Sequence, residues 1–173
     1  MLWRKLYVSL VRPHLEYASP VWSPYHTGDK KTLEKVQHRL TRMARGLKRL
    51  QYNERCDRLS LTSLDSRRKR ADLIQLYRIL NGLDTLRLCN PPSFCTNING
   101  PTTRGHNKRL KAEIFSSTIR NKFGSGVSAR EHFFTNRVVP YWNDLPQSVV
   151  DATSLQQFKR RLDEHIKNIG QDF

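Results

Sequence analysis

The sequence predicts a mainly α-helical protein, and three observations support that fold class. Apolar residues recur every three or four positions through most of the chain, as on the buried face of a helix. Residues typical of helix starts precede several of these runs. A stretch rich in Pro, Asn, Thr and Gly, CNPPSFCTNINGPTTRGHN, interrupts the pattern. We therefore expect a basic bundle of three or four helices over 1–82, a loop-rich basic linker over 83–127, and a small helical tail over 128–173.

Two helices are expected in the first fifty residues. The first runs from Leu2 to about Tyr17 and kinks at Pro13, because a proline has no N–H for the helical ladder; the segment SPVWSPY then stops it. The second begins near Asp29 and ends at about Gly46. Its expected buried stripe is Leu33, Val36, Leu40, Met43 and Leu47. The cations expected on the opposite side are Lys31, Lys35, Arg42, Arg45 and Arg49, with Arg39 at the margin.

A short helix and turn are expected over 52–61, followed by a longer helix that Thr62 or Ser63 caps and that ends at Gly82. The expected buried stripe of the longer helix is Leu73, Leu76, Tyr77 and Leu80. Its first turns carry four consecutive cations, Arg67, Arg68, Lys69 and Arg70. Like charges there repel one another and oppose the helix macrodipole, and Asp65 and Asp72 relieve only part of this.

The rest of the chain is expected to form a poorly ordered linker and then two helical runs. RLKAEIFSS has weak strand-like alternation, and NKFGSGVSA indicates a turn. Apolar residues at helical spacing surround Pro140, namely Phe134, Val138, Tyr141, Trp142 and Leu145. Ser154 and Gln157 form a capping box for a final helix. Its apolar stripe is Leu155, Phe158, Leu162, Ile166 and Ile169.

The chain carries a formal net charge of +16, and this charge is unevenly distributed. Residues 1–82 contain 18 basic and 7 acidic residues, 83–127 contain 7 and 2, and 128–173 contain 6 of each. Such a field destabilises a compact state unless an anion offsets it, so the sequence favours a polyanionic partner. The alternative is a solvated basic surface with no specific ligand.

The number of cysteines and the hydropathy pattern indicate in which cellular compartment the protein is expected. Three cysteines are an odd number and suit a reducing compartment better than a disulfide framework. We expect a nuclear or cytoplasmic protein with no membrane partner, because no apolar run approaches the roughly 18 residues of a membrane span. The first fifteen residues also have the character of a mitochondrial transit peptide, which is an alternative reading of the same segment.

Motifs for metal binding and catalysis are incomplete in this sequence. His14 and Glu16 match half of a zinc deaminase signature, but no Pro-Cys-x-x-Cys completes it. Cys89, Cys95 and His106 form a possible zinc knuckle without a regular spacing or an evident fourth ligand. We therefore expect no metal, no cofactor and no catalytic residue.

Two phrases, LVRPHLEYASPVWSPY and FFTNRVVPYWNDLP, interrupt helix-like stretches with prolines among aromatic and small residues. Together with LEKVQHRLTRMARGLKRL, YNERCDRLSLTSLDSRRKRADLIQLYRILNGLD and TRGHNKRLK, they resemble the thumb and post-thumb region of LINE (jockey-like or CR1-like, non-LTR retrotransposon) reverse transcriptases. The resemblance spans nearly the whole chain. Two departures are Pro140, where the family usually has a leucine-like residue, and Ser60, where it commonly has a glycine.

The resemblance implies an RNA-directed DNA polymerase as the parent family. Polymerisation by that family needs paired aspartates for two metal ions, and no such pair occurs here, so this chain is not expected to be an enzyme on its own. MLWRKLYVSLVRP opens within an amphipathic helix, which leads us to expect a fragment whose palm and fingers lie upstream or in another chain. The alternatives are a helical protein-interaction module and an inert retrotransposon remnant.

The expected activity is binding of RNA, DNA or an RNA/DNA hybrid through phosphate contacts. The candidate residues lie on the second helix, in the basic turn and in TRGHNKRLK: Lys31, Lys35, Arg39, Arg42, Arg45, Arg67, Arg68, Lys69, Arg70, Arg104, Lys108, Arg109 and Lys111. Aromatic rings can also stack on bases. Trp22 and Tyr25, which lie between prolines, are the candidates for stacking, whereas Phe134, Tyr141 and Trp142 are expected in the core.

Overall fold

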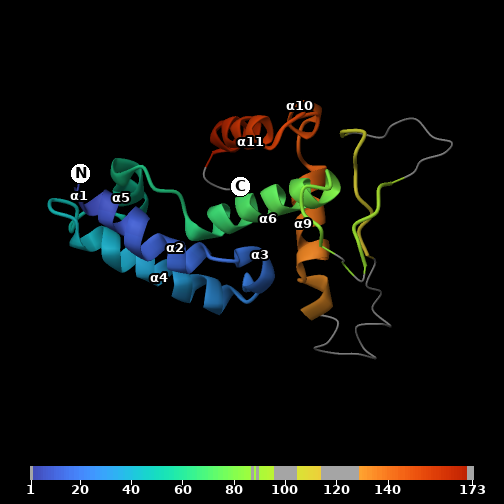
Figure 1. Ribbon diagram of the computed structural model, residues 1–173. Helices are drawn as coiled ribbons and strands as arrows, with labels where there is room; N and C mark the ends of the chain where they lie inside the picture. The colour runs from blue at the N-terminus through green and yellow to red at the C-terminus, as the bar shows by residue number, and fades with distance from the viewer. Residues whose placement is uncertain (1, 87, 89, 96–104, 114–128, 171–173) are drawn as a thin grey trace. The chain divides into compact units, whose positions relative to one another are not determined.

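A computed structural model describes residues 2–86, 88, 90–95, 105–113 and 129–170. Within these ranges it contains nine α-helices and one π-helical segment, and its only β pairing is an isolated bridge between Phe94 and Leu110, so the predicted fold class is confirmed (Figure 1). The chain forms two compact units, one of residues 1–71 with the chain end from Ile169, the other of residues 72–168. The boundary falls at residue 71, not at 82, because the helix α6 contributes to both units.

The first unit begins with a continuous helical stretch made of α1 (Leu2–Leu6), the π-helical η1 (Tyr7–Val11) and α2 (Arg12–Glu16). The π turn directly precedes Pro13, where a regular helix would bring the proline ring against the carbonyl of Ser9. The Arg12 N–H donates to the Tyr7 carbonyl, five residues back, so the wider turn keeps the helix hydrogen-bonded. The kink predicted at Pro13 is therefore accommodated upstream as a π bulge.

The first helical stretch ends where Ala18 adopts a left-handed conformation, with φ of 50°. SPVWSPY follows, but it is not purely a stop signal, because Ser19–Trp22 form the one-turn helix α3. The Trp22 indole N–H donates to the Tyr17 carbonyl at 2.6 Å and closes this turn.

Helix α4 (Thr27–Met43) starts and ends two or three residues earlier than predicted, and its buried face also differs. Val36 and Met43 were expected in the core but are 37% and 61% exposed. The residues that face inward are instead Gln37 and Thr41, which are 0% and 2% exposed. The stripe was predicted from apolar side chains alone, whereas hydrogen bonds stabilise polar residues at the centre of this face.

The buried Gln37 amide links three other parts of the first unit. It accepts a hydrogen bond from the Tyr7 hydroxyl at 2.6 Å, and it donates to the Tyr52 hydroxyl at 2.9 Å and to the Thr62 carbonyl at 3.1 Å. The Tyr52 hydroxyl in turn donates to Glu34, which also accepts the Leu64 N–H. Burial, together with the hydrogen bond to Glu34, raises the pKa of Tyr52, so its hydroxyl remains a donor at neutral pH. This network fixes the rotation of α4 about its axis.

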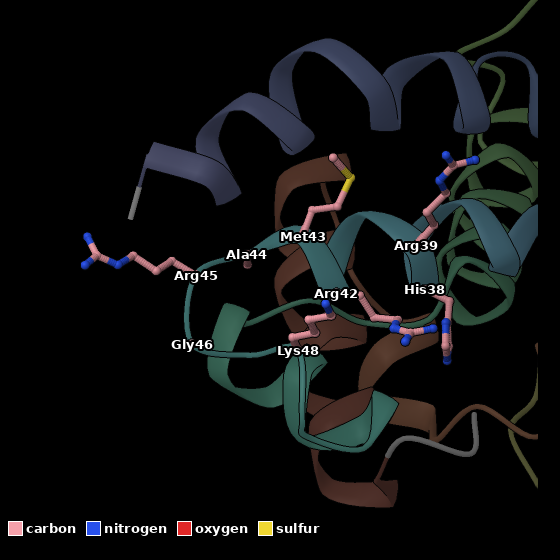
Figure 2. Close-up of a pocket in the computed structure, with 8 residues that line it drawn as sticks. All are labelled: His38, Arg39, Arg42, Met43, Ala44, Arg45, Gly46 and Lys48. Carbon is pink, nitrogen blue, oxygen red and sulfur yellow. The ribbon is translucent and has the colours of Figure 1, made fainter.

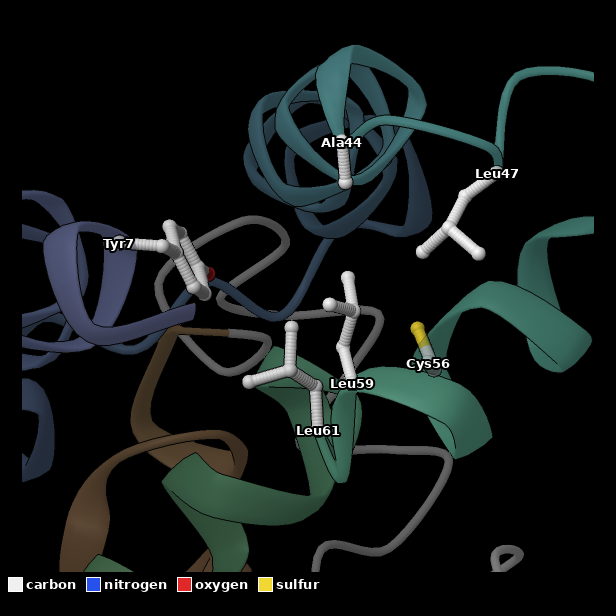
Figure 3. Close-up of a cluster of buried hydrophobic side chains, with 6 residues drawn as sticks. All are labelled: Tyr7, Ala44, Leu47, Cys56, Leu59 and Leu61. Carbon is white, nitrogen blue, oxygen red and sulfur yellow. The ribbon is translucent and has the colours of Figure 1, made fainter. Parts of the chain in front are cut away.

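An apolar cluster packs beside this network. It contains Tyr7, Ala44, Leu47, Cys56, Leu59 and Leu61 (Figure 3). Helix α5 (Tyr52–Leu59) begins with a capping box between Gln51 and Glu54 and ends at Ser60, which has a left-handed φ of 50°. The predicted 52–61 helix and turn are thus confirmed, and the left-handed Ser60 explains why a glycine suits this position.

Helix α6 (Leu64–Leu80) starts as predicted, since the Ser63 hydroxyl accepts the Ser66 N–H at 3.2 Å. Its Leu73, Leu76 and Tyr77 belong to the core of the second unit, as predicted. The other helices of this unit are α9 (Phe134–Asn143), α10 (Gln147–Val150) and α11 (Leu155–Ile169), the last of which extends one residue beyond the unit. Tyr77 stacks on Phe158 with ring centroids 4.3 Å apart.

The predicted tail helices form with small differences. Helix α9 continues through the exposed Pro140. The N-terminal cap of α11 is half of the predicted box: the Ser154 hydroxyl accepts the Gln157 N–H, while the Gln157 side chain bonds to Thr153.

Residues 105–111 of the predicted linker pack into the second unit. His106 and Leu110 are 2% and 1% exposed. The Asn143 side chain pairs with both backbone groups of Leu110, at 2.8 and 3.0 Å, and the Trp142 indole donates to the Lys108 carbonyl at 2.9 Å. The phrases TRGHNKRLK and VVPYWNDLP, which are far apart in the sequence, therefore contact each other. The expectation of a poorly ordered linker is wrong for 105–111.

Candidate nucleic-acid interface

Helix α4 presents a row of exposed cations on its outer face. Lys31, Lys35, Arg39 and Arg42 are all exposed, and within the described part of the chain none of them pairs with a carboxylate. We call these four residues the α4 row. The row is exposed because α4 is oriented with Gln37 and Thr41 facing the core, which turns these four cations outward.

The spacing of the α4 row suits a polyphosphate chain. At about 100° and 1.5 Å per residue, the four side chains stay within about 80° of arc. They advance by about 6 Å over each of the two four-residue steps and by about 4.5 Å from Arg39 to Arg42. The longer advance is close to twice the roughly 3.4 Å axial spacing of phosphates on one strand of B-form DNA. Each cation of the row can therefore face a separate phosphate along a nearly straight path.

The row ends at an open hollow of about 670 Å³ beyond the C-terminus of α4 (Figure 2). Its lining consists of His38, Arg39, Arg42, Met43, Ala44, Arg45, Gly46 and Lys48. Figure 2 shows Arg42, Lys48 and His38 on the same side, whereas Arg45 extends outward and Met43 points the other way. The negative end of the helix dipole stabilises cations here even without a ligand.

A buried guanidinium adds to the positive charge next to the hollow. Arg55 is 3% exposed; its Nε donates to the Thr41 hydroxyl at 3.1 Å and its Nη1 to the Leu50 carbonyl, both neutral acceptors. Its Nη2 is buried without a hydrogen-bond partner. Burial, together with the nearby Arg55 and Arg42, lowers the pKa of His38. The hollow therefore carries positive charge, and none of the described residues that line it is a carboxylate.

The basic turn of α6 is not a second free surface. Arg67 forms a two-point ion pair with Glu16, its Nη2 lying 2.8 Å from Oε2. Arg68 is 2% exposed, Lys69 lies 3.3 Å from Asp65, and Arg70 also has an interaction partner. Four like charges in one turn are tolerated because Glu16, 51 residues away, and Asp65 compensate them. We therefore correct the expectation that Arg67, Arg68, Lys69 and Arg70 are available to phosphates.

The third predicted patch is also dispersed. Arg104 lies outside the described residues. Lys108 lies 3.7 Å from Asp151, and Arg109 is partly buried with a partner of its own, which leaves Lys111 exposed. Backbone groups of the loop contact Trp142 and Asn143, and the partners of Lys108 and Arg109 leave no continuous cationic patch among the described residues.

The aromatic predictions divide between core and surface. Phe134 and Trp142 are 6% and 1% exposed and lie in the core, as predicted, while Tyr141 is partly buried. Trp22 and Tyr25 are each 39% exposed, so both remain candidates for stacking.

The possible zinc ligands do not assemble in the described residues. His106 Nδ1 accepts the Lys108 N–H at 3.1 Å, so Nε2 carries the proton that it donates to the Trp142 carbonyl at 2.8 Å. Both nitrogens are thus engaged, while Cys95 is an exposed thiol and Cys89 lies outside the described ranges. Within those ranges no three His, Cys, Asp or Glu side chains lie together as metal ligands.

Among the described helices, none combines the length and the apolarity needed to cross a bilayer.

Sequence reasoning missed three residues of this interface, His38, Lys48 and Arg55. Lys48 lies in the turn after α4, where a helical wheel no longer applies, and Arg55 belongs to another helix. The only sequence signal for the hollow was the clustering of cations in RMARGLKR.

Comparisons of the chain with models of known families, with curated proteins and with solved structures found no match.

Proposed function

We propose that the first unit binds the sugar-phosphate backbone of RNA, DNA or an RNA/DNA hybrid, and that the chain is the post-palm part of a non-LTR retrotransposon reverse transcriptase without catalytic residues of its own. The observation that carries the binding proposal is the α4 row, four exposed cations without carboxylate partners among the described residues. The proposed origin is supported by the quoted sequence phrases, which together span nearly the whole chain.

Phosphate contacts of this kind are expected to depend steeply on salt and weakly on base sequence. Each neutralised phosphate releases condensed counterions and contributes about 0.9 to the slope of log K against log salt on duplex DNA. Contacts by the four residues of the row thus correspond to a slope of about −3.6. Between 50 and 200 mM salt, this slope predicts an affinity loss of roughly 150-fold.

The test is a titration of a labelled RNA/DNA hybrid, in parallel with duplex DNA, at several salt concentrations. Lys31→Ala with Lys35→Ala is expected to lower the slope by about 1.8. Folding is expected to tolerate both changes, because alanine favours helix at exposed positions. The matched control is Arg160→Ala with Lys167→Ala, which removes the same charge from exposed positions of α11. Equal slopes for the two double variants, or binding that is insensitive to salt, would refute the proposal.

A second candidate function is a helical protein-interaction module. Leu2, Leu6 and Leu10 are spaced by four residues on one face of the first helical stretch and are 74%, 41% and 61% exposed. An apolar stripe of this kind suits a partner helix. Size-exclusion chromatography in high salt separates the two functions, because the interaction module predicts a stable oligomer there and backbone binding alone predicts a monomer.

A further inference from the structure

We propose that the hollow at the end of α4 binds the phosphomonoester at the end of a nucleic-acid strand, with Arg42 and Lys48 as direct ligands and His38 as a proton-sensitive third. This inference rests on the proposed function, since it assumes that the first unit holds nucleic acid. It adds a site of different specificity at the end of the α4 row, with which the hollow shares Arg39 and Arg42.

The first argument is the density of positive charge. Along the row, one cation follows another at about 4.5 to 6 Å of axial rise. In the hollow, Arg42 and Lys48 line one cavity with His38, and the buried Arg55 lies close enough to lower the pKa of His38. A backbone phosphodiester carries a single negative charge, whereas a phosphomonoester carries about −1.5 to −2 at pH 7 and offers three acceptor oxygens. A cavity lined by several cationic side chains suits the monoester.

The second argument is shape. The row lies on the convex side of a helix, where a continuous backbone can pass. The hollow is concave, and its volume of about 670 Å³ lies within the range of small-molecule sites. A concave site accepts a chain end more readily than the middle of a duplex.

The third argument is the unsatisfied buried charge of Arg55. A buried guanidinium normally has a carboxylate partner, because an unpaired buried charge is costly. Arg55 has only neutral acceptors among the described residues, and its Nη2 has no hydrogen-bond partner. A dianion in the neighbouring hollow would offset this charge through space.

His38 makes the site sensitive to pH. The groups that act on it are Arg55, Arg42 and Glu34, and its ring lies 4.9 Å from that of Tyr52. Without a ligand, burial and the two arginines keep its pKa below the usual value, so the ring is neutral at pH 7. A bound dianion favours the protonated ring, so monoester binding is expected to take up a proton and to strengthen as the pH falls toward 6.

The experiment compares binding of the full chain to one labelled DNA strand that carries a 5′-phosphate, a 3′-phosphate or only terminal hydroxyls. The labelled phosphorylated strand is then competed with free nucleoside 5′-monophosphate or with the unlabelled phosphorylated strand. We expect a strand with a terminal phosphate to bind at least about tenfold more tightly than the hydroxyl strand. Comparison of the 5′ and 3′ phosphates identifies the end that the hollow accepts. Lys48→Ala should abolish the preference, whereas Arg49→Ala, an exposed neighbour that does not line the hollow, should retain it. His38→Gln should remove the dependence of the preference on pH.

Three results would overturn the inference. They are equal affinity for phosphorylated and hydroxyl strands, a preference that survives Lys48→Ala, and competition by the free nucleotide as strong as that by the phosphorylated strand. These failures are distinct from failure of the proposed function. The salt slope and its dependence on Lys31 and Lys35 would remain intact if only the terminal site were wrong.

Discussion

Replacement of Gln37 by leucine tests whether the buried amide network holds the first unit together. Leucine is similar in size and apolar, so Gln37→Leu leaves little cavity and chiefly removes hydrogen bonds. The Tyr7 hydroxyl would lose its acceptor and the Thr62 carbonyl its donor, while Tyr52 would keep its bond to Glu34. The substitution therefore leaves two polar groups without the partners that they have in the native fold.

The expected loss of unfolding free energy follows from these two unpartnered polar groups. A buried polar group left without a partner costs about 1 to 3 kcal/mol, so two such groups cost about 2 to 6 kcal/mol. The Thr62 carbonyl is only partly buried, and leucine regains some apolar burial, so we expect a loss of about 3 kcal/mol. In a unit of this size, this loss corresponds to a fall in melting temperature of roughly 15 °C.

Urea and thermal unfolding of the full chain, followed by circular dichroism and by tryptophan fluorescence, would measure the effect. Trp3 and Trp22 report on the first unit and Trp142 on the second. Gln156→Leu is the matched control, because Gln156 is exposed on α11. A Gln37→Leu protein within about 0.5 kcal/mol of the control would refute the reasoning that this network orients α4.

Two further predictions concern Asp65 and Ser60. Burial raises the pKa of Asp65, but Lys30 and Lys69 outweigh burial and lower it, so the folded state binds this proton more weakly than the unfolded state. Asp65 therefore stabilises the fold above about pH 4. Urea titrations should show that Asp65→Asn is less stable than wild type at pH 7 and that the difference shrinks as pH falls through the folded pKa; a constant difference would contradict this. Ser60→Gly, at a left-handed residue, should raise unfolding free energy by up to about 1 kcal/mol, with Ser60→Ala as the comparison that gains nothing.

Local signals in the sequence predicted the helices well. Ser63 caps α6 as expected, Ser154 accepts the Gln157 N–H, and Leu73, Leu76 and Tyr77 are buried at the predicted spacing. These features depend on residues within one or two helical turns, so the local pattern contains the necessary information.

Contacts between distant residues account for what the sequence did not predict. The inward face of α4 depends on Tyr7, Tyr52 and Thr62, which no periodicity in 27–43 can reveal. The basic turn at 67–70 looked accessible because Glu16 lies 51 residues before Arg67. The positive charge beside the hollow includes Arg55, which belongs to α5 and lies near His38. The exposure of the α4 row was thus predicted from the sequence, whereas the internal ion pairs of the other two patches were not.

The pairing of Asn143 with Leu110 restricts the substitutions that this chain can accept. One side chain supplies both the acceptor and the donor that a neighbouring β-strand would normally provide. Aspartate at this position loses the donor, leucine loses both groups, and glutamine places its amide about one bond farther out. Among descendants of this sequence, residue 143 should therefore remain asparagine while Leu110 drifts among residues of similar volume, because the bonds engage only the backbone of the loop.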